Sequence, residues 1–145
     1  MNMARPAAKV ISVVTVVLTT VIIIGVFSLI LWFDNAKIMV KMEDNQVTME
    51  AAIYDTSFTI SDIQSIKILE KMPEDDFART NGGATEEFLI GHFKGKVTGN
   101  CMLYLYCDYV PILEIKLADQ TIYVNSKNEN DIKAWYQKLT QSSID

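Results

Sequence analysis

Hydrophobic and polar positions follow two very different patterns along this chain. From Val10 to Phe33, 24 residues pass without a charged side chain. A helix rises about 1.5 Å per residue, so this segment would reach roughly 36 Å, enough to cross a hydrocarbon core of about 30 Å. Because lipid offers no partner for backbone N–H and C=O groups, a lone span must be helical. The pattern predicts one transmembrane helix that anchors the rest of the chain.

The length of this segment and the residues at its end fit a membrane anchor better than a cleaved signal peptide. Trp32 and Phe33 stand at its end, where aromatic side chains favour the membrane–water interface. The run is too long for the apolar part of a cleaved signal peptide, and no small-residue cleavage site follows it. Gly25 and Ser28 are small enough for a second helix to approach, but there is no Gly-x-x-x-Gly pattern. The sequence therefore leaves the oligomeric state open.

Charges on either side of the span indicate an orientation. Arg5 and Lys9 precede it without an acidic neighbour, whereas Lys37 and Lys41 follow it close to acidic residues. Cytoplasmic flanks of membrane helices are richer in Lys and Arg, and the free amino group adds one more positive charge before the span. We expect a single-pass protein of the cell membrane, with residues 1–9 as a cytoplasmic tail and the C-terminal domain extracytoplasmic.

After a linker at residues 34–36, short alternating segments replace the apolar run and predict strands. Seven are expected, at residues 37–42, 46–53, 60–69, 88–93, 101–109, 111–117 and 121–125, with a short helix at 61–65 as an alternative. Residues 54–57 break the pattern, and residues 72–83 contain Pro, three consecutive acids and Asn-Gly-Gly, which are typical of an exposed connection.

The last periodic segment predicts a helix from Glu129 to Thr140, before a frayed tail at 142–145. Its apolar residues recur at helical spacing and form one stripe: Ile132, Trp135, Tyr136 and Leu139. Asn128 is a favourable N-cap. Residues 37–141 are therefore expected to form one mainly β domain, an antiparallel sheet curled into a barrel or sandwich, with Trp135 of the terminal helix closing its open end.

The composition of the chain argues against several classes of function. The 112 residues after Phe33 hold 11 of the 13 Lys and Arg and all 18 Asp and Glu, a formal charge of −7. Nucleic-acid binding needs a basic face, so no nucleic-acid partner is expected. Cys101 and Cys107 would lie roughly 20 Å apart on one strand, too far for a disulfide. The sequence has a single histidine, His92, and no catalytic motif. We therefore expect no metal site, no bound cofactor and no enzymatic activity.

The order of strands and terminal helix resembles a pleckstrin-homology (PH) domain, and most closely the bacterial PH-like modules found behind membrane helices. The resemblance is carried by IYDTSFTISDIQSIKILEKMP (Ile53–Pro73), ARTNGG (Ala78–Gly83), IGHFKGKVTGN (Ile90–Asn100), VPILEIKL (Val110–Leu117) and IYVNSKNENDIKAWYQKL (Ile122–Leu139). It implies a seven-stranded curled sheet, with Gly91 and Phe93 as the family's Gly-x-Phe, Asn125 near the helix start and Trp135 facing inward. The family's basic phosphoinositide loop is replaced here by Met42–Asn45, which contains two acids.

One local cluster of basic residues remains as a candidate site: Arg79, His92, Lys94 and Lys96. The three on the segment from His92 to Lys96 would point the same way on a strand, opposite to Phe93. Such a face could bind a small anion or a peptide, although a solvated strand face is the commoner meaning of such charges.

Three functions are compatible with these features. The first is a non-catalytic, membrane-anchored PH-like module that binds a membrane or envelope protein, for example through a sheet edge. The second is a lipid- or envelope-ligand sensor that binds at the open barrel end. The third is an enzyme of a type that no motif reveals.

Overall fold

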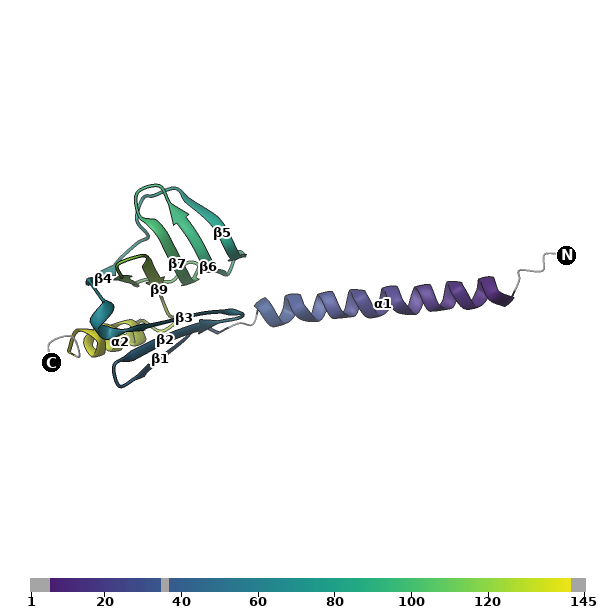
Figure 1. The fold of residues 1–145 in the computed structure, drawn as a ribbon, viewed down its shortest axis with the longest axis horizontal. Helices are drawn as coiled ribbons and strands as arrows, with labels where there is room; N and C mark the ends of the chain where they lie inside the picture. Colours follow the sequence, from purple (N-terminus) through teal and green to yellow (C-terminus); the bar gives the residue numbers. More distant parts are fainter. Residues whose placement is uncertain (1–5, 35–36, 142–145) are drawn as a thin grey trace. The chain divides into compact units, whose positions relative to one another are not determined.

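The computed structural model describes residues 6–34 and 37–141 (Figure 1). Parts of the predicted N-terminal tail (1–5) and linker (35–36), and the predicted frayed tail (142–145), lie outside the described residues. The chain separates into two compact units, residues 1–36 and residues 37–145, which are described in turn.

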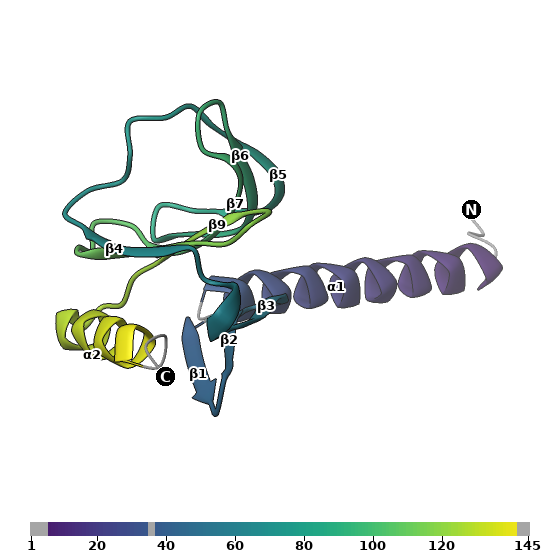
Figure 2. The same ribbon diagram turned by 60° about the vertical axis from the view of Figure 1, so that its left-hand side comes forward.

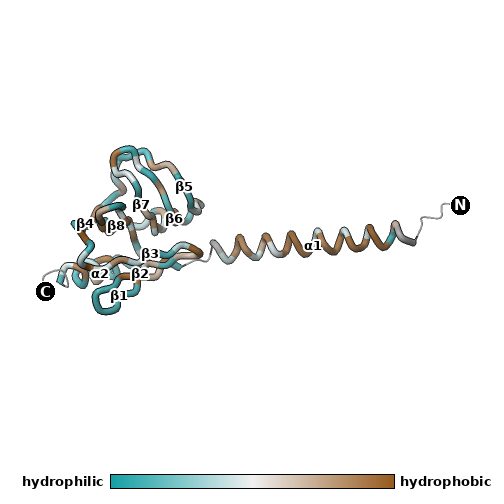
Figure 3. Tube along the Cα trace, viewed as in Figure 1, coloured by the Kyte–Doolittle hydropathy of each residue, from teal (hydrophilic) through white to brown (hydrophobic). Residues whose placement is uncertain are grey.

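The first unit is a single helix, α1 (Pro6–Asp34). Its segment Ala8–Trp32 is long and apolar enough to span a membrane. Hydrophobic residues recur along its whole length (Figure 3). The hydroxyls of Thr15, Thr19 and Thr20 donate to backbone carbonyls four residues earlier at 2.8–2.9 Å. These bonds satisfy the polar side chains within the helix, as an apolar environment requires.

The second unit contains two sheets and a terminal helix, α2 (Glu129–Gln141). A three-stranded antiparallel sheet consists of β1 (Met39–Glu43), β2 (Gln46–Ala51) and β3 (Tyr54–Thr59). After a 3₁₀ turn (Ile60–Asp62), a six-stranded sheet has the order β4-β8-β9-β7-β6-β5. Its strands are β4 (Ser65–Leu69), β5 (Phe77–Ala84), β6 (Phe88–Gly95), β7 (Gly99–Tyr106), β8 (Ile112–Lys116) and β9 (Thr121–Val124).

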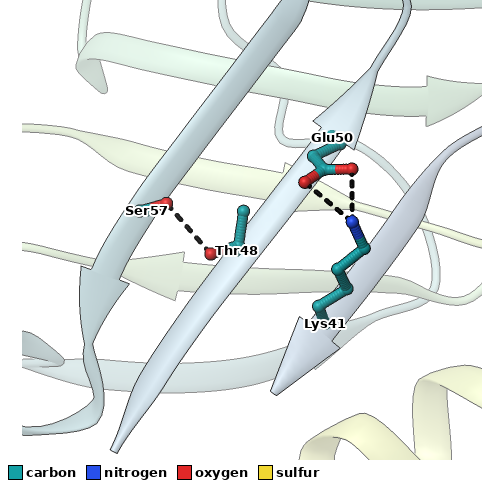
Figure 4. Close-up of polar contacts among 4 residues, drawn as sticks. All are labelled: Lys41, Thr48, Glu50 and Ser57. Atoms are coloured by element: carbon teal, nitrogen blue, oxygen red, sulfur yellow. Dashed lines mark hydrogen bonds and ion pairs between the residues drawn. The ribbon is translucent and has the colours of Figure 1, made fainter. Parts of the chain in front are cut away.

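The three-stranded sheet shows the alternation that the sequence predicts. Val47, Met49 and Ala51 of β2 are buried. Polar residues on its other face form cross-strand pairs (Figure 4): the Lys41 ammonium contacts the Glu50 carboxylate at 2.8 Å, and the Thr48 and Ser57 hydroxyls are 3.0 Å apart. This exposed face adds little stability, because solvent screens such ion pairs.

The six-stranded sheet is strongly curved, as Figure 2 shows. One face carries a cluster of buried side chains: Phe93, Cys101, Leu103, Leu105, Ile112 and Tyr123. The partly buried Leu69, Met72, Phe77 and Leu89 pack against this cluster. The opposite face carries the alternate residues of the same strands, including the fully buried Met102 and Ile122. The sheet is therefore buried on both faces along its central strands.

Helix α2 contacts β4 and β8. Its Ile132 and Leu139 are completely buried, whereas Trp135 and Tyr136 are half-buried. The N-cap prediction is confirmed, since the Asn130 N–H donates to the Asn128 side-chain oxygen at 3.1 Å. Trp135, for which an inward position was predicted, is partly buried, and Ile132 and Leu139 are the fully buried side chains of α2.

The predicted mainly β domain with a terminal helix is confirmed, but its details differ. There are nine strands in two sheets rather than seven in one, the β7–β9 pair is parallel, and the described residues do not form a closed barrel. Residues 54–57 and 77–83 were expected to be irregular and instead belong to β3 and β5. In β3, exposed Asp55 and Ser57 alternate with less exposed neighbours, so it pairs with β2 as a half-buried strand.

Candidate functional site

The six-stranded sheet ends at β5, and no strand in the described chain pairs with the outer side of β5. The β5–β6 register contains a bulge between Arg79 and Asn81, so that Thr80 has no partner residue in β6. The Thr80 hydroxyl instead donates to the carbonyl of His92 at 3.1 Å. Bulges re-aim side chains and interrupt an edge, so this edge is divided into two regular parts, Phe77–Arg79 and Asn81–Ala84.

The direction of the backbone groups along this edge follows from the hairpin that joins β5 to β6. The Thr85 N–H donates to the Phe88 carbonyl at 2.9 Å, which makes these two residues a hydrogen-bonded pair. Pairs in antiparallel strands alternate between hydrogen-bonded and non-hydrogen-bonded. Ala84, opposite Leu89, and Gly82, opposite Gly91, are therefore non-hydrogen-bonded positions. Their N–H and C=O groups point away from β6, to the side of β5 on which an additional strand would pair.

Two open hollows adjoin the bulge. The first, of about 590 Å³, is lined by Asp75, Asp76, Phe77, Ala78, Thr80, Lys94, Gly95 and Lys96. The second, of about 320 Å³, is lined by Thr80, Asn81, His92, Phe93, Asn100, Cys101, Asp119 and Gln120. Thr80 belongs to both, so the bulge lies between two depressions of different composition.

The four basic residues proposed from the sequence do not form one cluster. Lys94 and Lys96 line the first hollow, and His92 lines the second. Lys96 lies in the turn after β6 and forms an exposed ion pair with Asp76. Arg79 is opposite Phe93 in the register, so it points to the other face of the sheet from His92 and Lys94. It also lies in a strand, not in the loop that the sequence predicted.

Three of the four charged groups of the first hollow have partners on the protein. Asp76 pairs with Lys96, and Asp75 accepts hydrogen bonds from the backbone N–H groups of Thr98 and Val97 at 2.8 and 3.2 Å. Lys94 is exposed and has no ion-pair partner in the part of the chain that the structure describes. Its ammonium is thus the group of this hollow best placed to attract an acidic side chain.

Asp75 holds the β6–β7 turn, and this gives the turn a pH dependence. The N–H of Thr98, assisted by that of Val97, lowers the pKa of the Asp75 carboxyl from 3.8 to about 2. A lowered folded-state pKa means that the stabilisation is fully present above pH 3.8 and is lost as the pH falls through about 2. We expect the amide NMR signals of Val97 and Thr98 to titrate with a midpoint near 2 in the full-length protein. Asp75→Asn should abolish this titration, and Asp55→Asn should leave it unchanged.

Gly91, which the sequence singled out, permits the close approach of β5, β6 and β3. Its φ is +116°, and a Cβ there would lie 2.6 Å from the carbonyl oxygen of Asn81 and 3.3 Å from the ring of Tyr54. The Tyr54 ring packs edge-on against His92 with centroids 6.3 Å apart, and its hydroxyl donates to the Asn81 side-chain oxygen at 3.2 Å. The hairpin β2–β3 is thereby attached to the bulged strands.

Gly91→Ala is expected to destabilise the protein by about 2 to 3 kcal/mol, because it adds a backbone clash to an unfavourable positive φ. Gly99→Ala is the matched control. Gly99 also has a positive φ, +78°, but a Cβ there would meet no atom within 4 Å, so a loss of about 1 kcal/mol is expected. Urea unfolding of the full-length protein in detergent, followed by circular dichroism, measures both. Equal losses would show that close packing at Gly91 is unimportant.

Asn125 connects the end of β7 to the loop after it. Its side-chain oxygen accepts from the Tyr106 N–H at 2.7 Å, and its amide donates to the carbonyls of Tyr106 and Tyr109 at 2.8 and 2.7 Å. Its own N–H donates to the Tyr104 carbonyl at 3.1 Å. Asn125 is 1% exposed, so these bonds are shielded from water. Its position is a structural one, and it lies outside both hollows.

The described residues contain no group of three His, Cys, Asp or Glu side chains that could hold a metal ion. Burial raises the pKa of the Cys101 thiol to about 11 and that of the Tyr104 hydroxyl to about 12, so both are protonated and poorly nucleophilic at neutral pH. Both cysteines are free.

No known protein family, curated protein or solved structure matches this chain.

Proposed function

We propose that this chain is a single-pass membrane protein whose β domain binds an extended segment of a membrane or envelope protein and catalyses no reaction. The length and apolar character of α1 support the anchoring. The charges of Arg5 and Lys9 support an orientation with the N-terminus in the cytoplasm and the domain outside.

The observation that carries the binding function is the unpaired outer edge of β5 beside two hollows. An added strand would gain hydrogen bonds from the outward groups of Gly82 and Ala84. Lys94 of the first hollow and His92 of the second lie on the same face of β6, and every second side chain of a strand points to one face, so residues i and i+2 of the bound segment would meet different hollows. Lys94 favours an acidic side chain in the first of them.

The PH-like relationship is part of the proposal. It is supported by a helix that follows the last strand, by Gly91 and Phe93 together in a central part of β6, and by Asn125 just before α2. The parallel β7–β9 pair departs from the all-antiparallel arrangement that the resemblance implies. The β5 edge, and not the family, therefore supports the binding function.

Crosslinking from the β5 edge tests the binding function. With a photoreactive residue at Asn81, the full-length chain in its own cell membranes is expected to give one dominant adduct with another membrane protein, while the same residue at Ser57 gives none. Ala84→Pro removes an outward N–H and leaves the β5–β6 ladder intact, so it should abolish the adduct without loss of stability. Ala84→Val should retain it. An adduct that survives Ala84→Pro would contradict strand addition.

A second candidate, binding of an apolar ligand at the end of the curved sheet, is favoured by a different hollow. This hollow, of about 280 Å³, is predominantly apolar, and its lining includes Met72, Leu89, Leu105, Val110 and Ile112. We propose this hollow as the place of the lipid or envelope ligand that the sequence analysis considered. Leu89 and Met72 are only partly buried there and would gain contacts from such a ligand.

A further inference from the structure

The beginning of the domain is tied to one end of the six-stranded sheet. The Ile38 N–H donates to the Tyr106 hydroxyl at 2.9 Å. Beside it, the Cys107 N–H donates to the Glu87 carbonyl at 2.7 Å, which joins the β5–β6 turn to the loop after β7. We call this region, made of Ile38, residues 85–87 and residues 106–110, the Ile38 end. The β6–β7 turn at residues 96–98 lies at the opposite end of β7.

The Ile38 end exposes aromatic and aliphatic side chains. Tyr109 is 40% exposed and Val110 is 52% exposed. The rings of Tyr106 and Tyr109 meet edge-on with centroids 6.2 Å apart, and the Lys127 ammonium lies 4.8 Å from the centre of the Tyr106 ring. Tyrosines beside a long basic side chain are typical of the membrane–water interface, where the rings are partly buried and the ammonium stays hydrated.

This surface is held in place and does not fold back onto the core. The buried amide of Asn125 donates to the carbonyls of Tyr106 and Tyr109, which fixes the backbone of the loop. Tyr109 and Val110 are therefore displayed at a rigid position. A displayed apolar surface on a rigid loop gains free energy if an apolar medium covers it, with no ordering cost for the loop.

The covalent chain limits how far this surface lies from the end of α1. Four residue steps separate Asp34, the last residue of α1, from Ile38. A fully extended chain spans at most about 3.6 Å per residue, so the two residues lie within about 14 Å of each other. If α1 spans a bilayer, Asp34 is at its surface, and the Ile38 end is kept within reach of the headgroups.

On the premise that α1 is a membrane anchor, we propose that the Ile38 end rests on the same bilayer, with Tyr109 and Val110 in the headgroup region. Glu86, Glu87 and Asp108 line a hollow together with Tyr109, so attraction to lipid phosphates does not drive the contact, which is aromatic and apolar in nature. Anionic lipid should repel these carboxylates and should not strengthen the contact.

Fluorescence quenching measures this contact in the full-length protein reconstituted in phosphatidylcholine vesicles. In a Cys107→Ser background, an environment-sensitive dye is attached to Val110→Cys or, as the matched control, to Val97→Cys. Val97 is 89% exposed in the turn at the opposite end of β7. Headgroup-labelled nitroxide lipid is expected to quench the dye at position 110 at least about threefold more than at position 97. A second reporter, Glu87→Cys, should behave like Val110→Cys and covers the case in which the latter does not fold.

Flotation of the same vesicles tests the membrane anchoring by α1 separately from the bilayer contact of the Ile38 end. Protein that does not float contradicts the anchor itself. Floating protein with equal quenching at positions 110, 87 and 97 overturns the membrane contact and leaves the anchor standing. Quenching at position 110 that arises only after addition of phosphatidylserine also overturns the proposal, because the contact would then be electrostatic and due to Lys127.

Discussion

Replacement of Val16, Val21 and Val26 by arginine is expected to release the full-length chain from membranes. An arginine at the middle of a span costs about 2.5 to 3.5 kcal/mol, so the three together cost at most about 7.5 to 10.5 kcal/mol. Residues five apart are separated by about 140° around a helix, so the charges are spread over all sides of α1. The variant therefore gains no single polar face and cannot lie on the membrane surface as an amphipathic helix.

Alkaline carbonate extraction followed by flotation is the measurement. The wild-type chain is expected in the floating membrane fraction, and the arginine variant in the soluble or pelleted fraction. Val16, Val21 and Val26 replaced by leucine is the control, because it changes the same positions without adding charge. A triple-arginine variant that still floats after carbonate treatment would contradict a spanning role for α1 and, with it, the proposed anchoring.

The elements that could be predicted are those that a local pattern determines. Helix α1 follows from an unbroken apolar run, and α2 from a stripe at helical spacing with Asn128 as its cap. Strand β6 also follows from a local signal, and so do the two strands predicted on either side of residues 118–120, where the Leu117 N–H donates to the Gln120 carbonyl at 2.9 Å. In each case the residues that stabilise the element are close to it in the sequence.

Strand β5 could not be predicted, because its stability comes from distant residues. Between Ala78 and Ala84 it has no large apolar side chain, and Asn81-Gly82-Gly83 is a typical turn signal. The structure uses these glycines for close pairing: Gly82 lies opposite Gly91, and a Cβ on Gly82 would be 2.5 Å from the Ile90 carbonyl oxygen. The sequence contains no local sign that these two glycines meet.

The candidate site was missed for the same reason. Alternation along one strand correctly places His92 and Lys94 opposite Phe93. The bulge at Thr80 shifts the register between β5 and β6, and only this register decides which face Arg79 occupies. The outward groups of Gly82 and Ala84 depend on β5 being last in the sheet, which is a property of the whole topology.

Asn125→Ala is expected to destabilise the domain by about 3 to 5 kcal/mol. The substitution leaves the Tyr106 N–H and the carbonyls of Tyr106 and Tyr109 without the side chain that they bond. A buried polar group that loses its partner costs about 1 to 3 kcal/mol, and Asn125 serves three such groups. The effect should therefore exceed that of any single exposed substitution in the domain.

Asn125→Asp distinguishes the roles of its two polar atoms. Aspartate keeps an acceptor for the Tyr106 N–H but loses the amide that donates to the two carbonyls, and it adds a charge at a buried site. We expect it to be no more stable than Asn125→Ala at neutral pH and to recover part of the loss as the pH falls and the carboxyl becomes protonated. Asn100→Ala, at an exposed position, should change stability by less than about 0.5 kcal/mol. Urea unfolding of the full-length protein in detergent at pH 7 and pH 5 measures the stability of the three variants. A small loss of stability for Asn125→Ala would mean that water replaces the hydrogen bonds of Asn125. The loop carrying Tyr109 would then not be fixed by this side chain.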